Sequence, residues 1–298
     1  DEGLALAHAL SLERAGRLVE ARASSARLDA VRSPAVAHLQ ARLALATGDG
    51  DAARMHYEAL LNRHPADIHA RLGLVRALRW LGDWSRALGH LETASKQDRF
   101  DPILLQERVS IELELGRVTG AARPLRKLRR LTRDAAPSLP SIAEVQLAMG
   151  APSAALKALS GQEPPLLTAR IRLARRELPQ ARAALARAST NPESMEIGAQ
   201  IDLFEGQLDQ GRQRIGSALA VPVSTAQRAR LLHLLGEVED RAERPAAAAA
   251  AWRAANYTWG PPGTARAQRE SFVEIARSMD RELLAWLPHR VAGGEGVV

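Results

Sequence analysis

The stretch GDGDAARMHYEALLNRHP, Gly48–Pro65, combines a turn of small and acidic residues, apolar residues at helical spacing and a closing proline. Ala53, Tyr57 and Leu60 occupy i, i+4 and i+7 positions, which form one face of a helix. Because proline rarely continues a helix, the segment predicts a helix that begins after the glycine and ends before Pro65. The pairing of a turn glycine with an alanine five residues later recurs along the chain.

This pairing occurs five times in the first half of the sequence, at Gly16/Ala21, Gly48/Ala53, Gly82/Ala87, Gly116/Ala121 and Gly150/Ala155. Successive alanines are 32, 34, 34 and 34 residues apart. A fixed period of this length predicts supersecondary units that cannot bury their apolar faces alone and therefore stack. Weaker copies follow around Ala181, Gly211 and Ala248, so we expect about eight units.

The period, the A-x-x-x-Y pattern of Ala53 and Tyr57, and the closing Pro65 resemble the tetratricopeptide repeat. This resemblance implies an all-α, right-handed α-solenoid of about eight helix-turn-helix repeats with a C-terminal capping or linking helix. We expect the solenoid over residues 1–260, and the capping or linking helix and tail over residues 261–298. Apolar residues on one face of that last predicted helix are Phe272, Ile275, Met279, Leu283 and Trp286.

The carboxy-terminal segment LLHLLGEVEDRAERPAAAAAAWRAANYTWG, Leu231–Gly260, ends in an Ala-Asn pair and a short connector. It is similar to the last repeat of bacterial tetratricopeptide sulfotransferases, in which a linking helix and a catalytic domain follow. The donor-binding loop of that domain, of the type PRSGTT, is absent from this sequence. The resemblance implies a substrate-recruitment region of a sulfotransferase-like protein, with no catalytic residue and no cofactor in this chain.

Two alternatives to that interpretation remain open. The chain could be a stand-alone scaffold, assembly or regulatory repeat protein without an attached enzyme, because such a protein would show nearly the same sequence features. It could also belong to a complete sulfotransferase whose catalytic part lies outside these residues.

The amino-acid composition limits which binding partners and which cellular compartment we expect. The net charge is +7, but 38 of the 41 basic residues are arginines, which is typical of an arginine- and alanine-rich proteome and makes a nucleic-acid partner unlikely. The absence of cysteine excludes a disulfide, a thiolate nucleophile and a cysteine metal site. The sequence contains no apolar run that would span a membrane and begins with no signal peptide, so we expect a cytoplasmic protein.

The sequence contains none of the motifs that would indicate catalysis. Its eight histidines include no H-E-x-x-H motif, so we expect no metal site. A phosphate-binding glycine loop and a nucleophile elbow are also missing. Function therefore depends on the surfaces that the repeats present.

The first helix of each repeat is expected to line a concave groove. In this alignment the exposed groove positions of the early repeats are mainly basic or polar, which favours an acidic protein or peptide through charge-assisted hydrogen bonds. These positions do not match the pattern of repeats that clamp the carboxylate of chaperone tails. The predicted peptide-binding residues are His38, Arg42, His69, Arg76, Arg79 and Gln106.

A second basic surface is predicted in RPLRKLRRLTR, Arg123–Arg133, where leucines alternate with basic residues at helical spacing. The pattern indicates either a solvated outer face whose leucines pack inward, or a patch for an acidic partner or a membrane surface. Pro124 lies inside this predicted helix, which we expect to begin late or to kink. The residues of this basic patch are Arg123, Arg126, Lys127, Arg129, Arg130 and Arg133.

Overall fold

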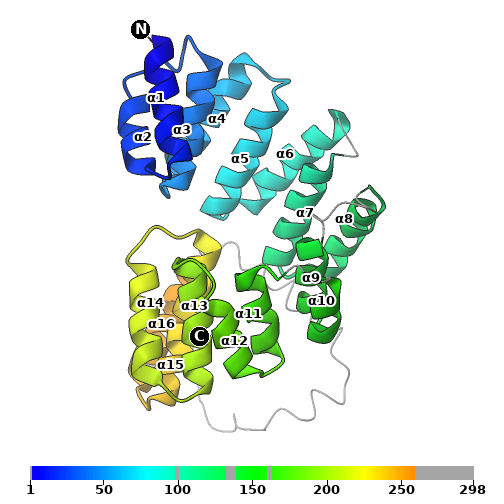
Figure 1. Cartoon of the computed structure of the whole chain (residues 1–298), viewed down its shortest axis with the longest axis vertical. Coiled ribbons are helices and arrows are strands. Elements are labelled where there is room, and N and C mark those ends of the chain that lie inside the picture. The colour runs from blue at the N-terminus through cyan, green and yellow to red at the C-terminus, as the bar shows by residue number, and fades with distance from the viewer. Residues whose placement is uncertain (1, 98–100, 132–138, 160, 162, 259–298) are drawn as a thin grey trace, which may run out of the picture. The chain divides into compact units, whose positions relative to one another are not determined.

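The computed structural model describes residues 2–97, 101–131, 139–159, 161 and 163–258 (Figure 1). These residues form sixteen α-helices and no strand. The chain divides into two compact units, Asp1–Thr258 and Trp259–Val298. The predicted capping or linking helix falls in the second unit, outside the described residues.

The helices follow one another as eight antiparallel pairs, which confirms the predicted all-α repeat fold. Within the described residues the pairs are α1 (Glu2–Arg14) with α2 (Leu18–Ser25), α3 (Pro34–Ala46) with α4 (Gly50–Arg63), α5 (Ile68–Leu81) with α6 (Trp84–Gln97), α7 (Pro102–Glu114) with α8 (Val118–Leu131), α9 (Leu139–Ala148) with α10 (Pro152–Ala158), α11 (Pro165–Ala174) with α12 (Leu178–Leu185), α13 (Pro192–Phe204) with α14 (Leu208–Leu219), and α15 (Thr225–Arg241) with α16 (Pro245–Thr258).

The turn inside each pair uses left-handed backbone geometry. Gly82 ends α5 with φ 80° and ψ 13°, and the N–H of the next residue, Asp83, donates to the Leu78 carbonyl at 2.8 Å. Arg176 and Glu243 occupy the corresponding turns of later pairs with φ of 61° and 57°. Non-glycine residues therefore hold the same turn there, which explains why the glycine pattern fades along the sequence.

The alanines of the repeated pattern bring the two helices of a pair together. All five that follow the early turn glycines are fully buried: Ala21, Ala53, Ala87, Ala121 and Ala155. A larger side chain at any of them would push the paired helices apart, because packed interiors leave no spare volume.

Short polar residues define where several helices begin. The Asp49 carboxylate accepts a hydrogen bond from the Ala52 N–H at 3.0 Å, and Asp67 accepts one from the Ala70 N–H at 2.9 Å. Such caps satisfy backbone donors that the first helical turn leaves unpaired. Pro34 and Pro102 occupy the first helical position, where a missing N–H costs little.

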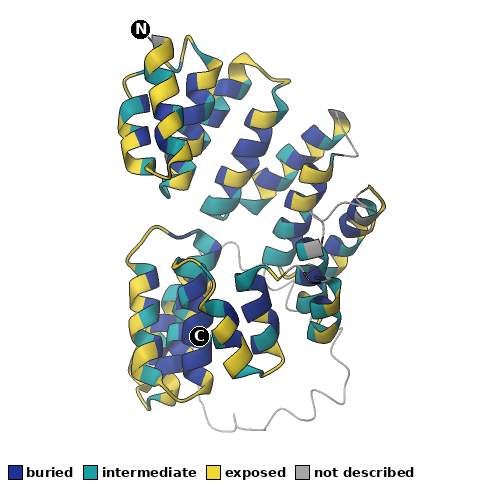
Figure 2. Ribbon diagram, viewed as in Figure 1, coloured by how far each residue is buried: buried dark blue, intermediate teal, exposed yellow. Residues whose placement is uncertain are grey.

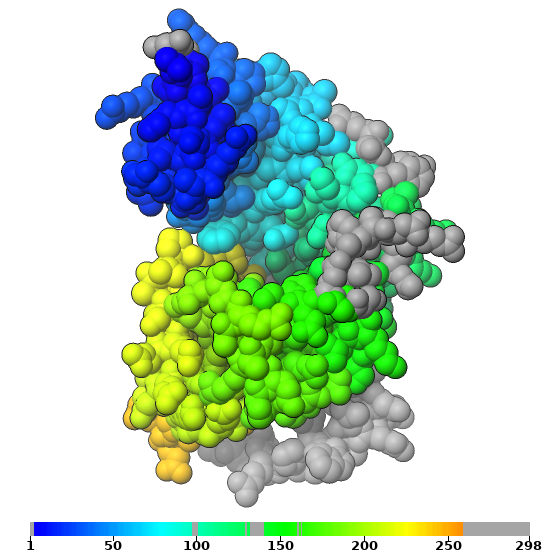
Figure 3. All heavy atoms as spheres, in the orientation of Figure 1, coloured from blue at the N-terminus to red at the C-terminus, as the bar shows by residue number. Residues whose placement is uncertain are grey.

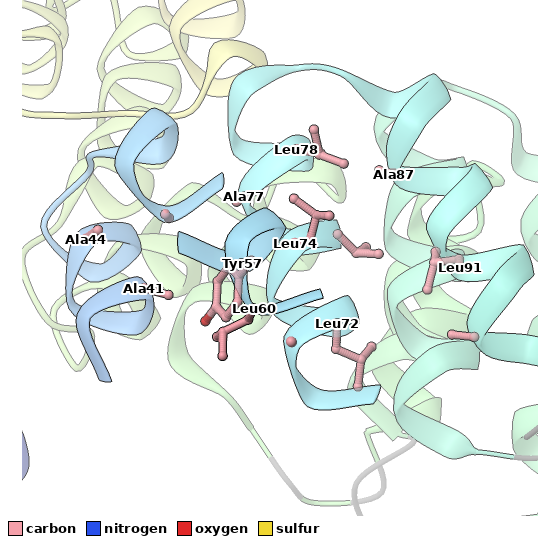
Figure 4. Close-up of a cluster of buried hydrophobic side chains, with 14 of the residues drawn as sticks. Ala41, Ala44, Tyr57, Leu60, Leu72, Leu74, Ala77, Leu78, Ala87 and Leu91 are labelled. Carbon is pink, nitrogen blue, oxygen red and sulfur yellow. The ribbon is translucent and has the colours of Figure 1, made fainter. Parts of the chain in front are cut away.

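The core is a series of clusters, each shared by neighbouring helix pairs, and the buried residues follow the contacts between helices along the array (Figure 2). The largest cluster joins α3 to α7 and contains Tyr57, Leu74 and Leu78, all drawn in Figure 4. In the space-filling view, side chains close the spaces between the ribbons of α1 to α4 (Figure 3). Each repeat thus depends on its neighbours for burial.

The expected late start of the helix that contains Pro124 is wrong. Helix α8 begins at Val118, and Pro124 lies inside it, buried. Because proline has no N–H, the usual helical hydrogen bond to the carbonyl of Gly120, one turn earlier, cannot form.

Candidate functional site

The first helices of neighbouring repeats are joined by ion pairs between arginine and glutamate. Arg42 of α3 donates from Nε and Nη2 to the two carboxylate oxygens of Glu13 in α1, at 3.0 and 2.7 Å. Arg76 and Arg79 of α5 both donate to Glu107 of α7, at 2.6 and 2.7 Å. We call the surface formed by the first helices α1, α3, α5, α7, α9, α11, α13 and α15 the first-helix face.

A similar pair lies near the other end of the array. Arg230 of α15 donates from Nε to Oε1 of Glu196 in α13 at 2.8 Å. Burial lowers the pKa of Arg230, but the hydrogen bond to Glu196 and the surrounding carboxylates outweigh that effect and raise it. Arg230 therefore keeps its charge at every accessible pH.

The two partners of these pairs differ in exposure. Side chains of Arg42, Arg76 and Arg230 are 47%, 49% and 49% exposed. Their partners Glu13, Glu107 and Glu196 are 23%, 10% and 9% exposed. On the first-helix face the carboxylates thus lie beneath the guanidinium groups, and the cations face solvent.

Two further carboxylates of this face have altered acidity. Burial raises the pKa of Glu144 in α9, with Arg170 opposing the rise and Glu193 adding to it. Burial also raises the pKa of Glu114 in α7, although Arg79 and a hydrogen bond from the Trp84 indole N–H at 3.3 Å oppose it. Among the described residues, Glu144 forms no hydrogen bond or ion pair.

Four of the six predicted groove residues form hydrogen bonds or ion pairs between neighbouring early repeats. Besides the three arginines, His38 lies half-buried with Nε2 2.8 Å from the Asp67 carboxylate, so it is tied to the start of α5. His69 and Gln106 are exposed. Whether these six side chains bind a peptide stays a prediction.

The predicted basic patch lies on α8. Arg123, Arg126 and Arg130 are exposed and Lys127 is half-buried, while Leu125 and Leu128 are buried. The side chain of Arg129 and the whole of Arg133 lie outside the part that the structure describes. The leucines therefore pack inward and leave the described cations at the surface.

Sequence reasoning missed the carboxylates of the first-helix face. One signal for them exists: Arg42, Arg76, Ser110 and Glu144 are 34 residues apart, so they occupy one repeat position whose side chain changes from basic to acidic. Glu107 and Glu196 lack such a signal. Their burial depends on the arginine of a neighbouring repeat, which becomes evident once the helices are stacked.

Neither a metal site nor a membrane span emerges from the helices. In the described residues, no three histidine, aspartate or glutamate side chains come together as a metal ion would require. None of the helices there has the length and apolar character to cross a bilayer.

Comparison with known proteins agrees with this architecture. A family model described as the tetratricopeptide repeat matches residues 44–106, which run from the end of α3 into α7. This part of the chain is similar to the tetratricopeptide repeat. No curated protein matches the sequence, and the similarity of Leu231–Gly260 to sulfotransferase repeats finds no support in these comparisons.

Solved structures share the repeat fold at low sequence identity. A tetratricopeptide repeat protein from Parabacteroides merdae ATCC 43184 is 14% identical, with a TM-score of 0.60, 80% of this chain covered and 98% of that one. A chain of the APC/C hetero-tetramer Cut9–Hcn1 is 12% identical, with a TM-score of 0.62, 81% of this chain covered and 49% of that one. At these identities the likeness shows the fold alone.

Proposed function

We propose that this tetratricopeptide chain is a protein-binding scaffold whose first-helix face holds an acidic segment of a partner. Tetratricopeptide repeats typically mediate protein interactions, and the early repeats carry the cations that such a segment needs. The proposed binding residues are His38, Arg42, His69, Arg76, Arg79 and Gln106.

The observation that carries this proposal is the difference in exposure within the arginine and glutamate pairs. A guanidinium group has five N–H donors, and the pair to Glu107 uses one donor of Arg76 and one of Arg79. The buried carboxylates fix the arginines in place, so less side-chain entropy is lost when a partner binds. The remaining donors face solvent and suit carboxylates or backbone carbonyls of a bound chain.

A finer proposal is that the scaffold recruits substrates for a sulfotransferase-like enzyme. The Ala255-Asn256 pair that ends the last described repeat supports it. A tethered groove would raise the local concentration of a substrate near a catalytic site. The alternative is a scaffold with no enzyme attached.

Sequencing the gene beyond the codon for Val298 separates these two possibilities. A strand followed by a loop of the type PRSGTT would support the sulfotransferase proposal. A stop codon close to the codon for Val298 would support the alternative, a scaffold with no enzyme attached.

Binding by the first-helix face can be tested with a labelled peptide in which Glu and Asp flank a tyrosine. The Arg42→Gln/Arg76→Gln variant should bind it at least about tenfold more weakly and with a flatter salt dependence, because charge-assisted hydrogen bonds are lost. Arg86→Gln is the matched control, since Arg86 is 51% exposed and also pairs with a glutamate, but lies on the second helix α6. Equal affinity of both variants and the wild-type chain would contradict the proposal.

A further inference from the structure

Helices α6, α7 and α8 line an open pocket of about 640 Å³ between the third and fourth repeats, which we call the cavity. This volume is in the range of pockets that bind drug-sized ligands or short peptide segments. None of the six proposed residues of the first-helix face contributes to it. The lining residues are Glu92, Ser95, Lys96, Leu104, Leu105, Arg108, Gly120, Arg123, Pro124 and Lys127.

The apolar part of the cavity comes from α7 and α8. Leu104 and Leu105 are 2% and 9% exposed, and Pro124 is buried. Gly120, one turn before Pro124, adds no side chain, and a Cβ atom there would lie 2.6 Å from the Glu112 carboxylate. Gly120 therefore lets α8 approach Glu112 of α7 closely, and Pro124 lies one turn further along the same lining.

The charged part of the cavity is strongly basic. Four lining residues are cations and one, Glu92, is an anion. Lys96 and Arg123 are exposed and form no ion pair with any residue that the structure describes, and Arg108 lies 4.0 Å from Glu112, at the outer limit for an ion pair. Lys96 and Arg123 thus differ from the arginines of the first-helix face, which already pair with carboxylates.

We propose that this cavity binds an acidic segment of a partner protein that also carries an apolar side chain. Carboxylates of the segment contact Lys96, Arg108 and Arg123, and its apolar side chain lies on Leu104, Leu105 and Pro124. Charge complementarity selects the occupant, because Lys96 and Arg123, which are exposed and form no ion pair within the described residues, favour a ligand with negative charge, and the neighbouring apolar side chains favour a nonpolar group. The site goes beyond the proposed function, since it is a second surface with its own ligand chemistry.

The test uses the full chain and a labelled twelve-residue peptide that repeats Glu-Asp-Leu. Fluorescence anisotropy should show that Lys96→Glu/Arg123→Glu binds at least about tenfold more weakly than the wild-type chain. Arg126→Glu/Arg130→Glu is the matched control, because it changes the net charge equally on exposed residues of α8 outside the cavity. Its affinity should stay within about twofold of wild type, and the thermal melting of both variants should stay close to that of the wild-type chain.

Three other results decide the proposal. A peptide that repeats Glu-Asp-Ser should bind at least about fivefold more weakly, because it has no leucine side chain to bury against the apolar lining. The Arg42→Gln/Arg76→Gln variant should keep its affinity for the leucine peptide, so that failure of the first-helix face and failure of the cavity are distinguishable. Equal losses in both charge-reversal double variants, or binding to anionic phospholipid vesicles without binding to the peptide, would overturn the proposal.

Discussion

At the scale of single residues, Asp202 of α13 is a buried carboxylate that pairs with two arginines. It is fully buried, and its two oxygens accept hydrogen bonds from Arg182 at 2.8 Å and Arg214 at 2.6 Å. We predict that Asp202→Asn lowers the free energy of unfolding by about 2–4 kcal/mol, because it leaves both arginines without their buried counter-charge. Urea unfolding followed by circular dichroism measures this loss.

The control for that variant is Asp209→Asn in α14. Asp209 also pairs with an arginine, Arg212, at 2.9 Å, but its side chain is 92% exposed. Exposed ion pairs contribute little, so this substitution should change the free energy of unfolding by less than about 0.5 kcal/mol. Similar losses of unfolding free energy in the two variants would show that the stability contribution of Asp202 does not depend on its burial.

Glu144 provides a prediction about pH. Because burial raises its pKa in the folded chain, the folded state binds the proton more tightly than the unfolded state. Its contribution to stability is therefore present at low pH and lost as pH rises through the raised pKa. The Glu144→Gln variant lacks this titration, so its melting temperature should exceed that of the wild-type chain at pH 7 and match it below about pH 4.

Thermal melts across that pH range, with Glu243→Gln in parallel, check the effect. Glu243 serves as the control because it is exposed in the turn between α15 and α16. A Glu144→Gln variant that is less stable than wild type at pH 7 would mean that the carboxylate has a stabilising partner.

At the scale of elements, two helical glycines of the third repeat should respond in opposite ways to the same substitution. A Cβ atom at Gly73 in α5 would lie 2.1 Å from the ring of Tyr57, whereas one at Gly89 in α6 would meet nothing within 4 Å. We predict that Gly73→Ala destabilises the chain by about 1–3 kcal/mol through overpacking. Gly89→Ala should stabilise it by up to about 1 kcal/mol, because alanine restricts the unfolded chain and favours helix.

Urea denaturation of both alanine variants gives the two free energies. Tyr57 cannot move aside easily, since it is 3% exposed and belongs to the largest buried cluster (Figure 4). If Gly73→Ala were as stable as the wild-type chain, the close approach of α4 and α5 would not depend on the missing side chain.

Helices and their pairing could be predicted from sequence because local chemistry determines them. The turn at Gly82 and the buried Ala87 lie within one repeat and follow from short-range spacing. The pair of Arg76 with Glu107 could not be predicted, because 31 residues separate the partners and contact depends on the stacking of neighbouring repeats. The cavity beside Pro124 could not be predicted for a related reason, since its lining comes from α6, α7 and α8 and depends on how two neighbouring repeats stack.

At the scale of the whole molecule, the array has no single centre of packing. Separate buried clusters join neighbouring repeats, with Leu74 in the cluster of α3 to α7 and Ile201 in a cluster of α11 to α13. In such an array stability is approximately a sum of repeat and interface terms, so a defect should act mainly on its own neighbourhood. A compact domain with one core would instead lose stability as a unit.

We therefore predict that cavity-forming variants have local effects. Leu74 and Ile201 are almost fully buried, so Leu74→Ala and Ile201→Ala should each cost about 2–5 kcal/mol. Hydrogen exchange measured by mass spectrometry should show that Leu74→Ala weakens protection in α3–α7 and leaves α13–α16 protected. Ile201→Ala should weaken protection in α13–α16 and leave α3–α7 protected. Equal loss of protection in all helices for either variant would mean that the repeats unfold together, and stability would then have to be treated as a property of the entire array.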